Sequence, residues 1–175
     1  MKKEIVVAAI AILVVGSCSN PVQRIEYGSG DEYGIYAAVL QGDSASSSYL
    51  LILRDSTYTS LVNIDSVRMA YIKNCIPSML EGALTNFVAV NRNNVGMKHI
   101  PGVNNLEIAG DGQKLSGRDT VFITLSRVGY DNSRTQALLE VGESVGPLAG
   151  SGSLILLEKV DGRWQIKARC MTWIS

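Results

Sequence analysis

Residues 152–170, "GSLILLEKVDGRWQIKARC", decide the fold, because two apolar runs lie on either side of Asp161-Gly162. Asp-Gly between such runs is the strongest short-range signal for a β-hairpin with a two-residue turn. The turn sets a register in which Val160 faces Arg163 and Lys159 faces Trp164. Continued along the strands, this register also pairs Leu157 with Ile166 and Ile155 with Ala168.

Residues that face each other in a hairpin share one side of the sheet. The apolar side, which we expect to cover the core, contains Ile155, Leu157, Trp164, Ile166 and Ala168, and Cys170 continues it. Lys167 and Arg169 are expected to point to the opposite side.

Further strands are predicted on the N-terminal side of this hairpin. "TVFITLSRVGY" (120–130) and "TQALLEVGE" (135–143) are apolar runs separated by turn residues, so the last third of the chain reads as an antiparallel β-meander. A strand is also predicted in "SYLLILRDST" (48–57), and a short one in "NLEIA" (105–109).

Two helices are predicted before the meander. "YGIYAAVLQG" (33–42) suggests a short helix, with Asp31 as a cap and Gly42 just past its end. A longer helix follows Pro77, because Ser78 and Glu81 have the spacing of a capping box. Its apolar stripe is Leu80, Leu84, Phe87 and Val88, and it should end near Asn91. The prediction is a single α+β domain over 33–175, with the capped helix packed on one face of an antiparallel sheet.

The N-terminal segment is typical of an export signal. Lys2 and Lys3 precede an apolar run of about a dozen residues, which is short of the roughly 20 that a membrane-spanning helix needs. Val15-Gly16-Ser17-Cys18 resembles the lipobox of bacterial lipoproteins. That resemblance implies removal of residues 1–17 and acylation of Cys18, including the amino group that cleavage creates. Several acyl chains would anchor the protein stably in a membrane.

Composition and charge narrow the function further. The polar residues 18–32 read as a lipidated tether to the domain, and loss of residues 1–17 takes the net charge from zero to −1. A chain without a basic patch is a poor binder of nucleic acid or of anionic lipid. We therefore expect a cell-envelope protein held to a membrane, on its periplasmic or surface side, by the lipid on Cys18, with no nucleic-acid partner and no cofactor.

Cys75 and Cys170 remain once Cys18 carries lipid. An oxidising compartment permits a disulfide between them. Buried free cysteines are also common, because cysteine behaves as a small apolar residue. The sequence leaves both alternatives open.

Signs of catalysis are weak. His99 is the single histidine, no CxxC or His-x-His spacing indicates a metal site, and no G-x-S-x-G elbow is present. The glycine-rich "AGSGS" (149–153) and "GDGQKLSG" (110–117) read as turns, because neither has the spacing of a phosphate loop. Asp55 and Glu140 could work as paired carboxylates if the fold brought them together.

The best candidate for binding is "SRVGYDNSR" (126–134), which places Arg127, Tyr130 and Asn132 at one strand end. A guanidinium fork and a phenol suit recognition of a carboxylate or a sugar. The alternative is that Arg127 pairs with a carboxylate across the sheet and Asp131-Asn132 forms a turn.

Four pieces of the chain together resemble a group of uncharacterised bacterial lipoproteins: "NFVAVN", "LSRVGYDNSRTQALLEVG", "LAGSGSLILLEKVDGRWQIK" and the closing "WIS". The resemblance covers roughly half of the chain, and implies an exported, lipid-anchored single domain without naming a substrate. We expect a binding module for a protein or glycan partner. The alternatives are a hydrolase of envelope or extracellular polymers, and a scaffold that docks a protein at its sheet edge or at an exposed Leu154/Leu156 patch.

Overall fold

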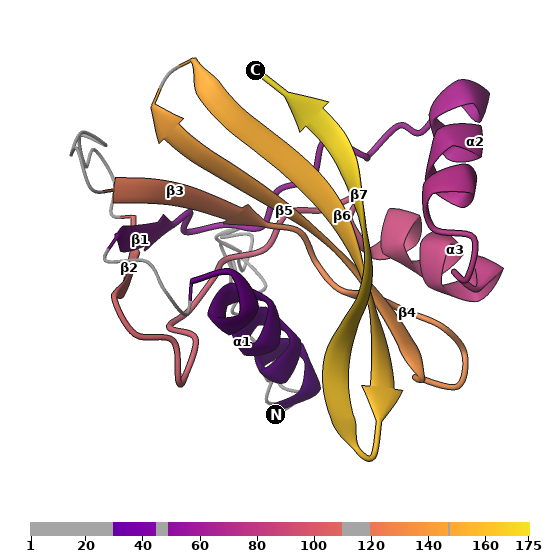
Figure 1. The fold of residues 1–175 in the computed structure, drawn as a ribbon, viewed down its shortest axis with the longest axis horizontal. Coiled ribbons are helices and arrows are strands. Elements are labelled where there is room, and N and C mark those ends of the chain that lie inside the picture. The colour runs from indigo at the N-terminus through magenta and orange to yellow at the C-terminus, as the bar shows by residue number, and fades with distance from the viewer. Residues whose placement is uncertain (1–29, 45–48, 110–119, 147) are drawn as a thin grey trace, which may run out of the picture.

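The computed structural model describes residues 30–44, 49–109, 120–146 and 148–175, which form an α+β fold around one mixed sheet (Figure 1). The three helices of these residues are α1 (Gly30–Ser44), α2 (Ser66–Cys75) and α3 (Glu81–Val90). Their seven strands are β1 (Leu50–Leu53), β2 (Leu106–Ile108), β3 (Thr120–Leu125), β4 (Gly129–Tyr130), β5 (Gln136–Gly146), β6 (Ala149–Val160) and β7 (Arg163–Ile174). The predicted signal, Cys18 and the tether up to residue 29 lie outside the described residues.

The sheet is mostly antiparallel, but it is not the simple meander that the sequence predicts. Its strand order is β2-β1-β3-β5-β6-β7, with β4 paired to β5 beside the end of β3. Strands β3, β5, β6 and β7 pair antiparallel, whereas β1 runs parallel to both of its neighbours. The prediction was therefore right for the last third of the chain and wrong for the sheet as a whole.

Helices cover both faces of the sheet, where the sequence predicted one main covering helix. Figure 1 shows α1 on one side, and α2 with α3 on the other. Alternate residues of β5 and β6 point to the two sides, so Leu139 and Ile155 pack with α1 while Leu138 and Leu154 pack with α2 and α3. Leu154 and Leu156 are fully buried. The predicted exposed Leu154/Leu156 patch is therefore wrong.

The hairpin of β6 and β7 follows the predicted register only near its turn. Val160 faces Arg163, Lys159 faces Trp164 and Leu157 faces Ile166, but an irregularity then shifts the pairing. Ala168 faces Leu156, one residue away from the predicted Ile155. A bulge moves the side chains beyond it to the opposite face, and here this holds until a second irregularity between Gly152 and Ser153 shifts the pairing again. Ala168 and Cys170 consequently pack under α2 and α3, and not beside Ile155.

Helix α3 ends near Asn91 as predicted, but it begins at Glu81, after the predicted cap Ser78, and it lacks the predicted capping box. Its N-cap residue is Leu80, whose side chain makes no capping hydrogen bond. The side chain of Gln136 on β5 supplies the missing hydrogen bonds. Its Oε1 accepts from the Leu80 amide at 2.8 Å, and its Nε2 donates to the Ser78 carbonyl at 2.9 Å. The helix start is thus satisfied from the sheet, a long-range contact that local spacing cannot reveal.

The other helices also depart from the prediction. Helix α1 begins at Gly30 and runs past Gly42 to Ser44. Asp31 lies inside its first turn, and its Oδ1 atom is 3.6 Å from Nζ of Lys159. Helix α2 is absent from the sequence prediction. Asp65 caps it, since its carboxylate accepts the amide of Arg68 at 2.7 Å.

Helix α3 lies directly on the backbone of β4. A Cβ at Gly129 would overlap the main chain of Phe87, so glycine is required there. This close approach buries Phe87 completely.

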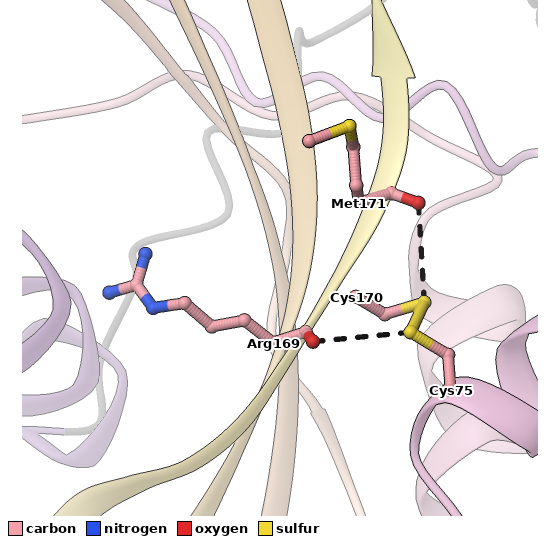
Figure 2. The surroundings of a disulfide bond; sticks show 4 residues. All are labelled: Cys75, Arg169, Cys170 and Met171. Atoms are coloured by element: carbon pink, nitrogen blue, oxygen red, sulfur yellow. Dashed lines mark hydrogen bonds between the residues drawn. A yellow bond between two sulfur atoms is a disulfide. The ribbon is translucent and has the colours of Figure 1, made fainter.

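Cys75 and Cys170 form a disulfide that joins the end of α2 to β7 (Figure 2), with their Cα atoms 5.7 Å apart. In Figure 2 the side chain of Arg169 points away from the disulfide, as expected for neighbouring residues of a strand. Within the described ranges, no helix combines the length and the apolar character needed to cross a membrane.

Candidate functional site

The indole of Trp173 lies flat on a patch of sheet that has no side chains. Gly142 on β5 pairs with Gly152 on β6, and Gly152 pairs with Trp173 on β7. A Cβ at Gly152 would overlap the indole, and one at Gly142 or Gly150 would come within 3.1 or 3.2 Å of the ring. Glycine inside a strand often marks such a close approach. The sequence predicts a turn at "AGSGS" (149–153), but these residues form the first part of β6.

A cleft of about 370 Å³ opens beside this ring, and we call it the Trp173 cleft. It is lined by Arg54, Tyr58, Ser60, Phe122, Thr124, Gly142, Glu143, Ser144 and Trp173. The Arg54 guanidinium lies 5.3 Å from the centre of the Tyr58 ring. The cleft thus combines three aromatic rings with hydroxyl groups and two residues of opposite charge. Its volume is in the range of small-molecule sites.

A second cleft of about 480 Å³ lies on the other side of Trp173, between α2 and the end of β7. We call it the α2–β7 slot. It is lined by Leu61, Asp65, Val67, Arg68, Tyr71, Ile72 and the four residues 171–174. Its surface is mainly apolar, and Trp173 is shared by the two clefts.

The buried carboxylate of Glu140 bonds one residue that lines each cleft, Ser60 of the Trp173 cleft and Thr172 of the α2–β7 slot. One oxygen accepts the Thr59 hydroxyl at 2.5 Å and the Ser60 amide at 2.7 Å. The other accepts the hydroxyls of Ser60 at 2.6 Å and Thr172 at 2.7 Å. Glu140 is 3% exposed. It therefore ties the chain before α2 and the residue next to Trp173 to the centre of the sheet.

The three residues predicted to bind a ligand lie at different places. Nη1 of Arg127 donates to the Val90 carbonyl at 3.2 Å, at the end of α3. The ring of Tyr130 lies 5.9 Å from that of Trp164, and Asn132 is exposed beside Gly82. None of the three lines the Trp173 cleft or the α2–β7 slot.

Electrostatics link Arg127 and Tyr130 to α1. Burial raises the pKa of Glu32, and the nearby charge of Arg127 works against that rise. Burial, and then the charge of Glu32, also raise the pKa of Tyr130, against the charge of Arg134, whose guanidinium lies 4.5 Å from the Tyr130 ring centre. The phenol is thus neutral under ordinary conditions, and its oxygen makes no hydrogen bond of normal geometry with the described residues.

Asp131 organises the turn between β4 and β5. Burial alone would raise its pKa, but hydrogen bonds from Ser133, Gln136 and Thr135 outweigh burial and lower it to about 2. The amide of Gln136 donates at 2.6 Å and that of Thr135 at 2.7 Å. The predicted turn at Asp131-Asn132 is therefore present, and an ionised carboxylate holds it.

The residues considered for catalysis do not converge on either cleft. His99 and Asp55 are exposed, whereas Glu140 is buried and accepts four hydrogen bonds. None of the three lines the Trp173 cleft or the α2–β7 slot. Among the described residues, no group of three or more His, Cys, Asp or Glu side chains could hold a metal ion.

Comparison with protein-family models, with curated proteins and with solved structures found no match for this chain.

Sequence reasoning missed Trp173, Tyr58 and Arg54. One signal was present: Gly142, Gly150 and Gly152 occur in or beside strand patterns, close to a tryptophan in the following strand. Glycines that face an aromatic ring across a sheet leave room for it to lie flat. The distant Tyr58 and Arg54 carry no comparable local signal.

Proposed function

We propose that this protein is a lipid-anchored binding module of the cell envelope, and that the Trp173 cleft is its ligand site. The anchor part of the proposal rests on the lipobox-like Val15-Gly16-Ser17-Cys18 and on the export signal before it. The binding part rests on one observation: the indole of Trp173 packs on the backbone of glycine residues, and a cleft lies beside it.

The lining of the Trp173 cleft favours a glycan. Aromatic faces pack well against the C–H groups of a sugar ring, while hydroxyl and charged groups at the edge bond its hydroxyls. The cleft supplies the rings of Trp173 and Tyr58, the hydroxyls of Thr124 and Ser144, and the guanidinium of Arg54. Because the ring of Trp173 is fixed by the glycines beneath it, little side-chain entropy is lost when a ligand binds.

The ligand proposal is tested by binding of the purified protein to immobilised envelope glycans, including peptidoglycan strands. Trp173→Ala should weaken binding at least tenfold, which corresponds to about 1.4 kcal/mol. Arg127→Ala should bind as the parent protein does, and thermal melts should show that both variants are folded.

Three outcomes would count against this site. Equal binding by Trp173→Ala, or no glycan bound by the parent protein, would reject the Trp173 cleft as a glycan site. Loss of binding in Arg127→Ala alone would transfer the site to Arg127, Tyr130 and Asn132.

The anchor is tested separately through Cys18. Cys18→Ala should give an unprocessed precursor or a soluble product, because the thiol that carries the lipid is absent. The measurement is fractionation of cells with metabolic labelling by a fatty acid. Membrane retention and labelling equal to those of the parent protein would overturn the lipid anchor and leave the ligand proposal untouched.

A further inference from the structure

The floor of the Trp173 cleft belongs to one face of the sheet. Phe122 faces Ser144 and Thr124 faces Gly142 across β3 and β5, so these four lining residues share a face. The ring of Trp173 lies against Gly142 on the same face. The cleft therefore lies over β3 and β5, between Trp173 and the chain that follows β1.

Arg54 and Tyr58 form the wall that lies across β3 from Trp173. The amide of Arg54 donates to the Ile123 carbonyl at 2.9 Å, and the amide of Tyr58 donates to the Leu125 carbonyl at 2.9 Å. These backbone hydrogen bonds fix both residues beside β3. The Arg54 guanidinium lies at cation–π distance from the Tyr58 ring. Stacking uses the face of a guanidinium and leaves its in-plane N–H donors free for a ligand.

The charge that the cleft offers to a ligand is positive. Arg54 takes part in none of the ion pairs among the described residues, and Asp55, which follows it, does not line the cleft. The acidic lining residue, Glu143, faces Ile123 across the sheet, and Ile123 belongs to the core beneath α1. The carboxylate of Glu143 consequently points to the face opposite the cleft, and Glu143 makes an interaction of its own. Among the described residues, the cleft therefore presents one guanidinium and no carboxylate.

We infer that the glycan bound in the Trp173 cleft is acidic, and that Arg54 holds its carboxylate while its sugar ring packs on Trp173. This inference rests on the proposed function, because it names the class of glycan that the same cleft takes. A guanidinium and a carboxylate pair through two parallel hydrogen bonds, which fix the orientation of the ligand. One cation matches the single charge of a sugar carboxylate, whereas a phosphate monoester carries up to about two charges.

Such a carboxylate has two sources among glycans. It is part of the sugar ring in uronic acids, and it is carried by a lactyl ether in the glycan strands of peptidoglycan. Arg54 would recognise the same group in both, so the two kinds of glycan are tested side by side.

The test measures binding of oligogalacturonate and of peptide-free peptidoglycan strands to the purified protein by isothermal titration calorimetry. Each glycan is used as the free acid and as the methyl ester, which keeps the sugar ring and removes the charge. We expect the free acid of at least one glycan to bind about fivefold more tightly than its ester, because an exposed ion pair contributes modestly.

Arg54→Gln should bind the free acid and the ester equally, because a neutral amide replaces the guanidinium. The matched control is Arg92→Gln, which should keep the preference for the acid, since Arg92 is exposed and lines neither cleft. Thermal melts should show that both variants are folded. Trp173→Ala should weaken binding of both forms of the glycan, because it removes the surface on which the sugar ring packs.

Equal binding of acid and ester by the parent protein, for both glycans, would overturn the acidic ligand. The proposed glycan site would still stand if Trp173→Ala bound more weakly. A preference for the acid that survives in Arg54→Gln would overturn the role of Arg54. If neither glycan binds in either form, the proposed site and this inference both fail. A preference that is confined to one glycan, and is lost in Arg54→Gln, supports the inference and identifies the source of the carboxylate.

Discussion

Glu140→Ala is expected to destabilise the fold by on the order of 4 kcal/mol, because four donors lose the carboxylate that satisfies them. Hydrogen bonds to a charged group contribute about 1.5–3 kcal/mol each, and they do not add fully. The donors belong to Thr59, Ser60 and Thr172. They lie at a site that is 3% exposed, where water cannot replace the lost acceptor without rearrangement. Urea unfolding followed by circular dichroism measures the difference.

The matched variant Glu140→Gln keeps the shape and one acceptor oxygen, so it should lose about half as much stability. Glu107→Ala, at an exposed position of β2, should stay within about 0.5 kcal/mol of the parent protein. A loss below about 1 kcal/mol in Glu140→Ala would show that these hydrogen bonds do not hold the sheet to the segment before α2.

Removal of the Cys75–Cys170 disulfide is the second large effect that we expect. The two residues are 95 positions apart, and a cross-link over a loop of that length limits the unfolded chain strongly. Measured losses for native disulfides are typically about 2–4 kcal/mol. The variant with both Cys75→Ala and Cys170→Ala should show this loss in thermal or urea unfolding.

Reduction supplies the control for the disulfide. A reducing agent should lower the stability of the parent protein to that of the double variant, and should leave the double variant unchanged. If the parent protein unfolds identically with and without the reducing agent, the bond contributes nothing to stability.

The parts of the fold that local sequence determines could be predicted. Asp161-Gly162 specifies a turn by its own backbone preference, and the pairing of Val160 with Arg163 follows from it. The bulge beyond Leu157 depends on the contacts of Ala168 and Cys170 with α2 and α3, so the turn cannot reveal it. Sequence does carry one missed signal, because the unbroken apolar run 154–157 is typical of a strand that is buried on both faces.

Contacts between distant segments explain the remaining errors. Gln136 caps α3 from 56 residues away, so Ser78 and Glu81 had the spacing of a capping box without its hydrogen bonds. The Trp173 cleft could not be predicted from the sequence for the same reason. Tyr58, Phe122 and Trp173 meet only through the sheet, whereas Arg127, Tyr130 and Asn132 were grouped by their closeness in sequence.

The position of β1 between β2 and β3 governs the order in which this protein can fold. Residues 50–53 pair in parallel with residues 106–108 and 120–123, so neither partner exists when β1 is first made. Closing such long loops lowers the entropy of the chain before the new contacts stabilise it. Folding rates therefore fall as contacting residues become more distant in sequence. A chain that is synthesised or exported from its N-terminus must therefore keep the apolar segment "LLIL" unpaired until the middle of the sheet arrives. That delay is compatible with the export proposed above, because an exported chain stays unfolded until it has crossed the membrane.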